Sequence, residues 1–201
     1  MTLTLYHSSA SPFVRLAQVA ALELGVDDLV LAPVATTPVE SDQTLIPANP
    51  LGKIPALARP DGPTLFDSRV ICRYLDARAG GRLYPSAGLF EVLTLEALAH
   101  GIAEAAVLSV YEKRFRPPEA QNADWLAGQW AKISRGLDCV ETQWMSHLSG
   151  PLNMAQIALG CALGYLDFRK VGENWRMGRP ALGDWHTRFD QRPSMIETAP
   201  A

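Results

Sequence analysis

The sequence predicts an α/β domain followed by an all-helical domain. Over the first 80 residues, short apolar segments of strand length alternate with segments whose apolar residues recur at helical spacing. Beyond residue 86 the spacing is helical throughout, and residues 80–85 between the two halves show no period. We therefore predict two domains, over residues 1–80 and 87–201.

The first strand is expected over residues 2–6, and the first helix follows it closely. Pro12 suits the first position of a helix, and apolar residues recur at helical spacing from Phe13 until Gly25 ends the pattern. Ser11 is then the N-cap residue. Free amides and the positive end of the helix dipole favour an anion here, and a serine hydroxyl can donate a hydrogen bond to it. The alternative is a serine that only caps the helix.

A second segment, Asn-Pro-Leu-Gly-Lys-Ile-Pro-Ala-Leu over residues 49–57, places Pro55 just before a short apolar strand. A cis peptide before this proline would turn the chain and expose the backbone of Ile54. Because proline donates no hydrogen bond, a ladder bond is lost, and the Ile54 amide and carbonyl stay available to an extended, peptide-like ligand. The alternative is an ordinary turn proline before an edge strand.

A third segment opens another helix. Further strands are expected over residues 29–34, 56–59 and 64–66, with a hairpin turn at 60–63. Asp67 and Ser68 then begin an amphipathic helix that ends near residue 79. A hydroxyl, a carboxylate and free amides thus meet again at a helix start.

The second half contains four expected helices. A long apolar stripe runs from Leu89 to about residue 116, where two prolines stop it. Helices over residues 122–148 and 153–168 follow, and a last long helix begins at Pro180. Residues 153–168 are apolar on nearly all sides, so this helix is expected in the middle of a bundle, with Asn153 and Gln156 as an approximate capping pair.

Composition excludes several classes of function. With 48% hydrophobic residues, the 201-residue chain can bury a sizeable core, and its net charge of −3 offers no basic patch for nucleic acid. No apolar run reaches the ~18 residues of a membrane-spanning helix, and residues 1–25 lack the features of a signal peptide. We expect a cytoplasmic protein without a membrane partner. The spacing of the cysteines and histidines predicts neither a disulfide framework nor a metal site.

Taken in this order, the serine-proline helix start, the Gly-Lys-Ile-Pro segment and the acid-serine pair resemble the glutathione transferase family over the whole chain. The serine directly before Pro12 is similar to the helix start of the tau-like and omega-like branches, which points to a bacterial-type, serine-dependent member. The resemblance implies a thioredoxin-like N-terminal domain, an all-helical C-terminal domain and a homodimeric, cytoplasmic detoxification enzyme. Its co-substrate would be glutathione and its second substrate a small apolar electrophile.

The resemblance implies a role for a hydroxyl near the first helix. Ser11 would stabilise the glutathione thiolate, with Ser9 as the second candidate and Ser8 and Tyr6 as weaker ones. Lowering the thiol pKa by about two units takes ~2.7 kcal/mol, which one hydrogen bond to a charged group (~1.5–3 kcal/mol) and the helix dipole supply together. No general base is needed.

The resemblance also implies partners for the rest of glutathione. Lys53 would meet the glycine carboxylate, and the Ile54 backbone before Pro55 would pair with the cysteinyl amide. Ser68 and its helix amides would hold the γ-glutamyl carboxylate, and Asp67 would take the γ-glutamyl ammonium. The family more often has glutamate, one methylene longer, in place of this aspartate, so the ammonium contact is expected to be weaker or to pass through a water molecule.

The pocket for the second substrate is expected to involve the long helix that follows residues 80–85 and the C-terminal end of the chain. A glutathione-binding protein without turnover, or a glutathione-dependent peroxidase or isomerase, is an alternative to the transferase. A thiol–disulfide oxidoreductase is disfavoured because Ala10 and Ser11 stand where it needs a cysteine. Wall candidates for the pocket are Ala103, Val107, Tyr111, Arg114 and Trp175.

Overall fold

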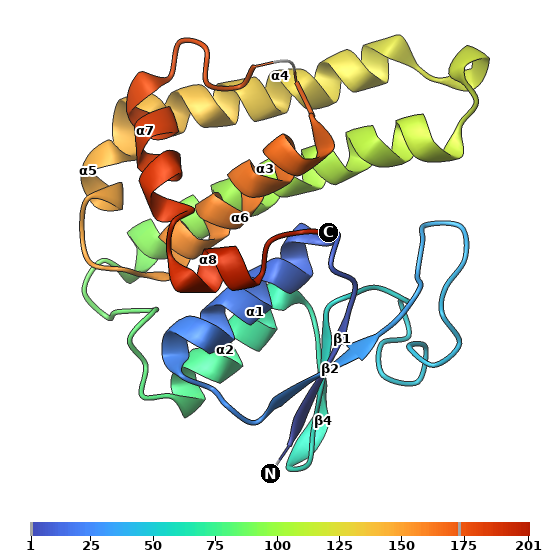
Figure 1. Cartoon of the computed structure of the whole chain (residues 1–201), viewed down its shortest axis with the longest axis vertical. Coiled ribbons are helices and arrows are strands. Elements are labelled where there is room, and N and C mark those ends of the chain that lie inside the picture. The colour runs from blue at the N-terminus through green and yellow to red at the C-terminus, as the bar shows by residue number, and fades with distance from the viewer. Residues whose placement is uncertain (1, 173) are drawn as a thin grey trace. The chain divides into compact units, whose positions relative to one another are not determined.

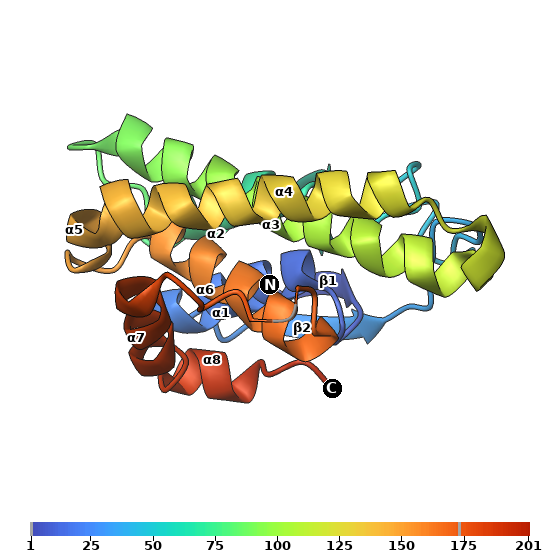
Figure 2. The same ribbon diagram turned by 90° about the horizontal axis from the view of Figure 1, so that it is seen from above.

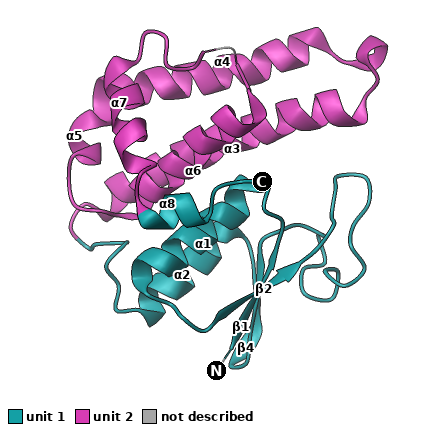
Figure 3. Cartoon of the chain, in the orientation of Figure 1, with its two compact units in different colours: residues 1–86, 193–201 teal, residues 87–192 magenta. Residues whose placement is uncertain are grey.

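The computed structural model describes residues 2–172 and 174–201, and the chain divides into two compact units (Figure 3). The first unit comprises residues 1–86 and 193–201, and the second comprises residues 87–192. The sequence prediction assigned residues 87–201 entirely to the helical domain. The last nine residues instead belong to the first unit, because their helix packs on the first helix of the chain.

The first unit is built on a four-stranded sheet with the strand order β2-β1-β3-β4. Strands β1 and β2 are parallel, whereas β3 runs antiparallel to both β1 and β4. Leu5 lies at the centre of the sheet, in register with Leu31 and Leu57. The strands are β1 (Leu3–His7), β2 (Leu29–Pro33), β3 (Ala56–Arg59) and β4 (Gly62–Leu65).

Helices α1 (Pro12–Leu24), α2 (Ser68–Arg78) and α8 (Pro193–Glu197) complete the first unit, with α1 and α2 packed together (Figure 1). Helix α1 ends where Gly25 adopts a φ of 69°, a conformation that glycine tolerates without a steric cost. The β1-α1-β2 unit followed by an antiparallel hairpin and α2 is a thioredoxin-like arrangement. This part of the fold prediction is confirmed.

The second unit is helical. Helix α3 (Leu89–Phe115) packs along both α4 (Ala123–Cys139) and α6 (Met154–Arg169), which Figures 1 and 2 show from two sides. Almost every residue of α6 from Met154 to Leu166 is buried, as its all-round apolar pattern predicts. The shorter elements are the 3₁₀ turn η1 (Pro118–Ala120), the π-helical turn η2 (Val140–Trp144), α5 (Met145–Leu148) and α7 (Pro180–Phe189).

Three local features refine the sequence expectations for this unit. The single helix expected over residues 122–148 is interrupted by the π-helical turn η2 before α5. The capping pair of α6 is present: the amide of Asn153 donates to Gln156 Oε1 at 2.9 Å, and the amide of Ala155 donates to Asn153 Oδ1 at 3.0 Å. The expected last long helix is two helices, because α7 ends at Phe189 and Pro193 starts α8.

Helix α3 is long and apolar enough, by length and composition, to cross a membrane, with a mean hydropathy of 1.4 in its most apolar window. It packs against α4 and α6 and contributes nine buried side chains, so half of that window is buried. This is the behaviour of a core helix, which passes the same test of composition.

Candidate functional site

Ser11 lies at the start of α1 with one hydrogen-bonding role filled and another open. Its Oγ accepts a hydrogen bond from the amide of Val14 at 3.3 Å, so it is the N-cap that the sequence predicts. Its own amide donates to the main-chain oxygen of Ser8 at 3.1 Å, which fixes the loop before the helix. Among the described residues, no atom accepts the hydroxyl proton of Ser11, and the side chain is half-buried. The hydroxyl can therefore donate to an anion while it caps the helix.

Ser9, the second candidate, uses its hydroxyl differently. This exposed serine donates a hydrogen bond from Oγ to the main-chain oxygen of Ala201 at 3.2 Å. Its proton is thus engaged within the first unit. Tyr6 lies inside β1, where its backbone is in register with Ala32 and Ala56 of the neighbouring strands. This position is that of a structural residue of the sheet.

The loop before β3 carries the cis peptide between Ile54 and Pro55 that the sequence suggested. In the described structure neither the amide nor the carbonyl of Ile54 has a main-chain partner, so both are open to a ligand. The side chain of Lys53 is exposed beside them. Asn49, to which the sequence reasoning gave no role, is 2% exposed and donates from Nδ2 to the main-chain oxygen of Lys53 at 2.8 Å.

Asn49 also accepts a hydrogen bond from the amide of Leu51 at 3.1 Å through Oδ1. The nitrogen and the oxygen of the Asn49 side-chain amide therefore both stabilise the conformation of the loop. The contact of Oδ1 with the amide two residues later is an Asx turn. The signal was available in the sequence, because asparagine followed by proline and glycine is typical of such turns.

Ser68 is a buried polar side chain at the start of α2. It is fully buried in the first turn of α2, and its Oγ has no hydrogen-bond partner among the described residues. A buried hydroxyl without a partner costs roughly 1–3 kcal/mol of stability. A ligand that accepts a hydrogen bond from this hydroxyl would remove that cost. The helix start adds the open Ser68 amide to the same position.

Asp67 is the N-cap of α2 and accepts from the amide of Arg69 at 3.0 Å. Its second carboxylate oxygen pairs with the Arg69 guanidinium at 3.2 Å, with both side chains about half exposed. An incoming ammonium group would share this carboxylate with Arg69. The peptide between Phe66 and Asp67 is also cis, a non-proline feature for which the sequence carries no signal.

Arg15 of α1 forms hydrogen bonds with the C-terminal segment. The sequence analysis gave this arginine no role. Arg15 is 4% exposed and donates from Nη2 to the main-chain oxygen of Met195 at 2.8 Å and from Nε to Thr198 Oγ1 at 3.4 Å. A hydrogen bond from the Ser194 hydroxyl to the Glu23 carboxylate also connects α8 with α1. These contacts place the end of the chain where it reaches Ser9.

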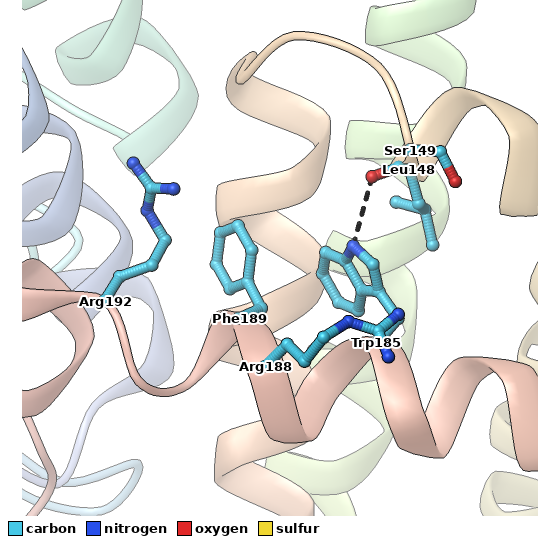
Figure 4. Close-up of a pocket in the computed structure, with 6 residues that line it drawn as sticks. All are labelled: Leu148, Ser149, Trp185, Arg188, Phe189 and Arg192. Atoms are coloured by element: carbon cyan, nitrogen blue, oxygen red, sulfur yellow. Dashed lines mark hydrogen bonds between the residues drawn. The ribbon is translucent and has the colours of Figure 1, made fainter.

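The helical unit contains separate cavities of its own. One, of about 390 Å³, has Trp185 and Phe189 stacked in its wall with ring centroids 4.7 Å apart (Figure 4). The indole of Trp185 is fixed by a 3.2 Å hydrogen bond to the main-chain oxygen of Leu148, drawn dashed in Figure 4. Another cavity, of about 370 Å³, includes the predicted wall residue Trp175.

The two units together define a class of protein, a thioredoxin-like domain joined to an all-helical domain. The chain belongs to the glutathione S-transferase family. Residues 5–83 match the family model described as the glutathione S-transferase N-terminal domain, and residues 123–188 match that of the C-terminal domain. The resemblance seen in the sequence is thereby confirmed.

Relatives of known structure extend over the whole chain. A glutathione transferase family member from Pseudomonas fluorescens Pf-5, solved with bound glutathione, is 43% identical with a TM-score of 0.96, and both chains are covered completely. A glutathione S-transferase from Methylobacillus flagellatus KT, solved with glutathione, is 34% identical with a TM-score of 0.85 and the same coverage. The uncharacterized GST-like protein YibF of Escherichia coli K12 is 35% identical, with 96% of each chain covered.

Proposed function

We propose that this protein is a glutathione transferase in which the Ser11 hydroxyl and the start of α1 stabilise the glutathione thiolate for attack on a small apolar electrophile. The observation that carries the proposal is the fully buried Ser68 hydroxyl, which has no partner among the described residues. A γ-glutamyl carboxylate at the start of α2 would give this hydroxyl the acceptor it lacks.

The other groups of glutathione have complementary partners in the first unit. The open Ile54 amide and carbonyl beside cis-Pro55 suit the cysteinyl backbone, which would pair in the manner of an added strand. The exposed Lys53 ammonium supplies a point charge for the glycine carboxylate. Asp67 would take the γ-glutamyl ammonium while it also pairs with Arg69, so we expect this contact to be shared.

Thiolate stabilisation follows from the two roles of Ser11. Its Oγ already accepts the Val14 amide, and its proton remains available to the sulfur. With a chlorinated nitroaromatic, the thiolate forms a carbon–sulfur bond and chloride leaves with the electron pair of the carbon–chlorine bond. No proton is removed in that step once the thiolate exists, so binding side by side supplies the remaining acceleration.

Ligands of the Pseudomonas fluorescens relative agree with this chemistry. One of its structures holds glutathione, and another, 42% identical to this chain, holds S-(propanoic acid)-glutathione, in which the sulfur carries a carbon substituent. We further propose a cytoplasmic homodimer with a detoxifying role, in which the first unit of one subunit packs on the helical unit of the other. Binding without turnover, and peroxidase or isomerase activity at the same site, are the competing functions.

The proposal is tested by binding and turnover together. Glutathione-agarose should retain the wild-type protein, and a chlorodinitrobenzene should be conjugated faster than in buffer alone. Ser68→Ala should weaken retention, whereas Ser11→Ala should reduce conjugation with retention largely kept. Retention without conjugation would leave a binding protein, and absence of retention would contradict the assignment of the site.

A further inference from the structure

The cavity of about 390 Å³ shown in Figure 4 lies within the helical unit. Its volume falls in the range of small-molecule sites. Neither the glutathione contacts proposed above nor the wall residues predicted for the second substrate belong to it. The cavity is lined by Leu148, Ser149, Trp185, Arg188, Phe189 and Arg192, and we call these six residues the α7 pocket.

Two aromatic rings form one wall of the α7 pocket. Trp185 and Phe189 are one helical turn apart in α7, and their rings stack with an interplanar angle of 23°. The main-chain oxygen of Leu148, which accepts from the Trp185 indole, also accepts from Gln156 Nε2 at 3.0 Å. Neighbouring residues therefore fix the position of this wall before any ligand binds, which lowers the entropy cost of binding.

An irregular backbone segment positions the helix that carries this wall. Glu141, in the π-helical turn η2, accepts hydrogen bonds from the amides of Ala181 at 3.1 Å and Leu182 at 2.7 Å in the first turn of α7. The same turn leads directly into α5, whose last residue, Leu148, lines the pocket. Because π-helical turns are frequent at functional sites, η2 is an independent observation in favour of a site here.

The α7 pocket also carries positive charge. Figure 4 shows Arg192 beside the ring of Phe189, and its guanidinium carbon lies 5.6 Å from the ring centroid. The side chain of Arg188 is exposed, and within the described residues it forms no ion pair or hydrogen bond. The residues that line the pocket include no carboxylate. A ligand with a negative charge would therefore meet only positive or neutral groups in the lining.

The helix dipole explains only part of this arrangement. Arg188 lies in the last turn of α7, where the negative end of the dipole favours a cation. The dipole does not explain the cavity beside this cation or its aromatic wall. A carboxylate can accept two parallel hydrogen bonds from a guanidinium group, and an aromatic ring packs favourably against other aromatic rings in stacked or edge-on geometry. A ligand that carries both groups would use the whole lining.

We propose that the α7 pocket is a second small-molecule site, which binds an aromatic carboxylate with its ring against Trp185 and Phe189 and its acid group on Arg188. All lining residues belong to the second unit, whereas the residues proposed to bind glutathione belong to the first. The inference therefore goes beyond the proposed transferase function and does not depend on it.

Three matched probes test the site by calorimetry on the whole protein. Naphthoate carries both the ring and the acid group, naphthamide lacks the charge, and decahydronaphthoate lacks the aromatic ring. We expect naphthoate to bind about fivefold more tightly than the amide, the upper end for an ion pair near solvent. It should bind about threefold more tightly than the saturated acid. Hydrogen exchange should show that naphthoate protects residues 145–149 and 185–192.

Variants assign these preferences to side chains. Arg188→Gln should reduce the preference for acid over amide towards one, and Arg188→Lys, which keeps the charge, should retain part of it. Arg135→Gln removes a cation from the exposed face of α4 and is the matched control, with the preference unchanged. Phe189→Leu should reduce the preference for the aromatic over the saturated acid. A thermal melt checks that each variant is folded.

Several results would overturn the proposal. These are no binding of naphthoate, equal affinity for naphthoate and naphthamide, and a preference for the acid that persists in Arg188→Gln. Saturating glutathione should leave naphthoate binding unchanged, and loss of binding would instead place the acid in the glutathione site. None of these results contradicts the transferase proposal, which is tested by retention on glutathione-agarose and by conjugation.

Discussion

Substitution of Ser11 separates its two roles, because the structure gives the side chain both a cap and an unused proton. Ser11→Ala removes both. Ser11→Asp keeps a good N-cap acceptor but cannot donate to a thiolate and adds a like charge beside it. Ser11→Thr keeps both roles and is the matched control.

The expected magnitudes follow from these roles. Loss of the cap costs about 1 kcal/mol of stability, and the 3.3 Å length of the bond to the Val14 amide favours the lower half of the usual range. Loss of the donor removes ~1.5–3 kcal/mol of thiolate stabilisation, which raises the pKa of bound glutathione by about one to two units. At neutral pH this should reduce turnover by about 10- to 100-fold.

The assay is an absorbance titration of the bound thiolate, with a thermal melt on each variant. We expect Ser11→Ala to show a raised thiol pKa and a lowered melting temperature. Ser11→Asp should raise the pKa at least as much while its melting temperature stays near that of the wild type. Ser9→Ala should change the pKa little, because its proton is engaged with Ala201.

Two results would refute this reasoning. A larger pKa increase in Ser9→Ala than in Ser11→Ala would move the thiolate contact to Ser9. An unchanged pKa in Ser11→Asp would show that the alanine variant acts through the lost cap, and that the hydroxyl proton is not the stabilising group.

Four further outcomes are expected. Ser68→Ala should weaken glutathione binding about tenfold in calorimetry without lowering the melting temperature, because its Oγ has no partner in the described structure. Ser11→Cys should attack oxidised glutathione and expel one glutathione thiolate, and intact mass would reveal the mixed disulfide, whose absence would count against Ser11. Burial lowers the pKa of His186 from 6.5, against the opposing charges of Asp167 and Asp190, so below that pH the unfolded chain binds more protons and stability declines. The urea midpoint should therefore drop more from about pH 7 to 5 in the wild type than in His186→Gln. Sedimentation equilibrium should give twice the 21.9 kDa chain mass, and a single-chain mass would contradict the dimer.

Local signals were sufficient to predict most of the fold. Pro12 and Gly25 bound α1 because one suits the first helical position and the other adopts the left-handed conformation that ends the helix. The break between α7 and α8 was missed because Pro193 lies within a continuing helical pattern. The π-helical turn at Val140 was missed for a related reason, since one extra residue in a turn leaves the apolar spacing almost unchanged.

The site was predictable only as far as each residue's role depends on its neighbours in sequence. The N-cap role of Ser11 depends on Val14, three residues away, so the sequence was sufficient to predict it. The role of Ser9 depends on Ala201, 192 residues away, through a C-terminal segment that Arg15 fastens to α1. The two candidate serines therefore differ in the fold in a way that the sequence does not show, because a distant acceptor engages the proton of Ser9 and leaves that of Ser11 for a ligand.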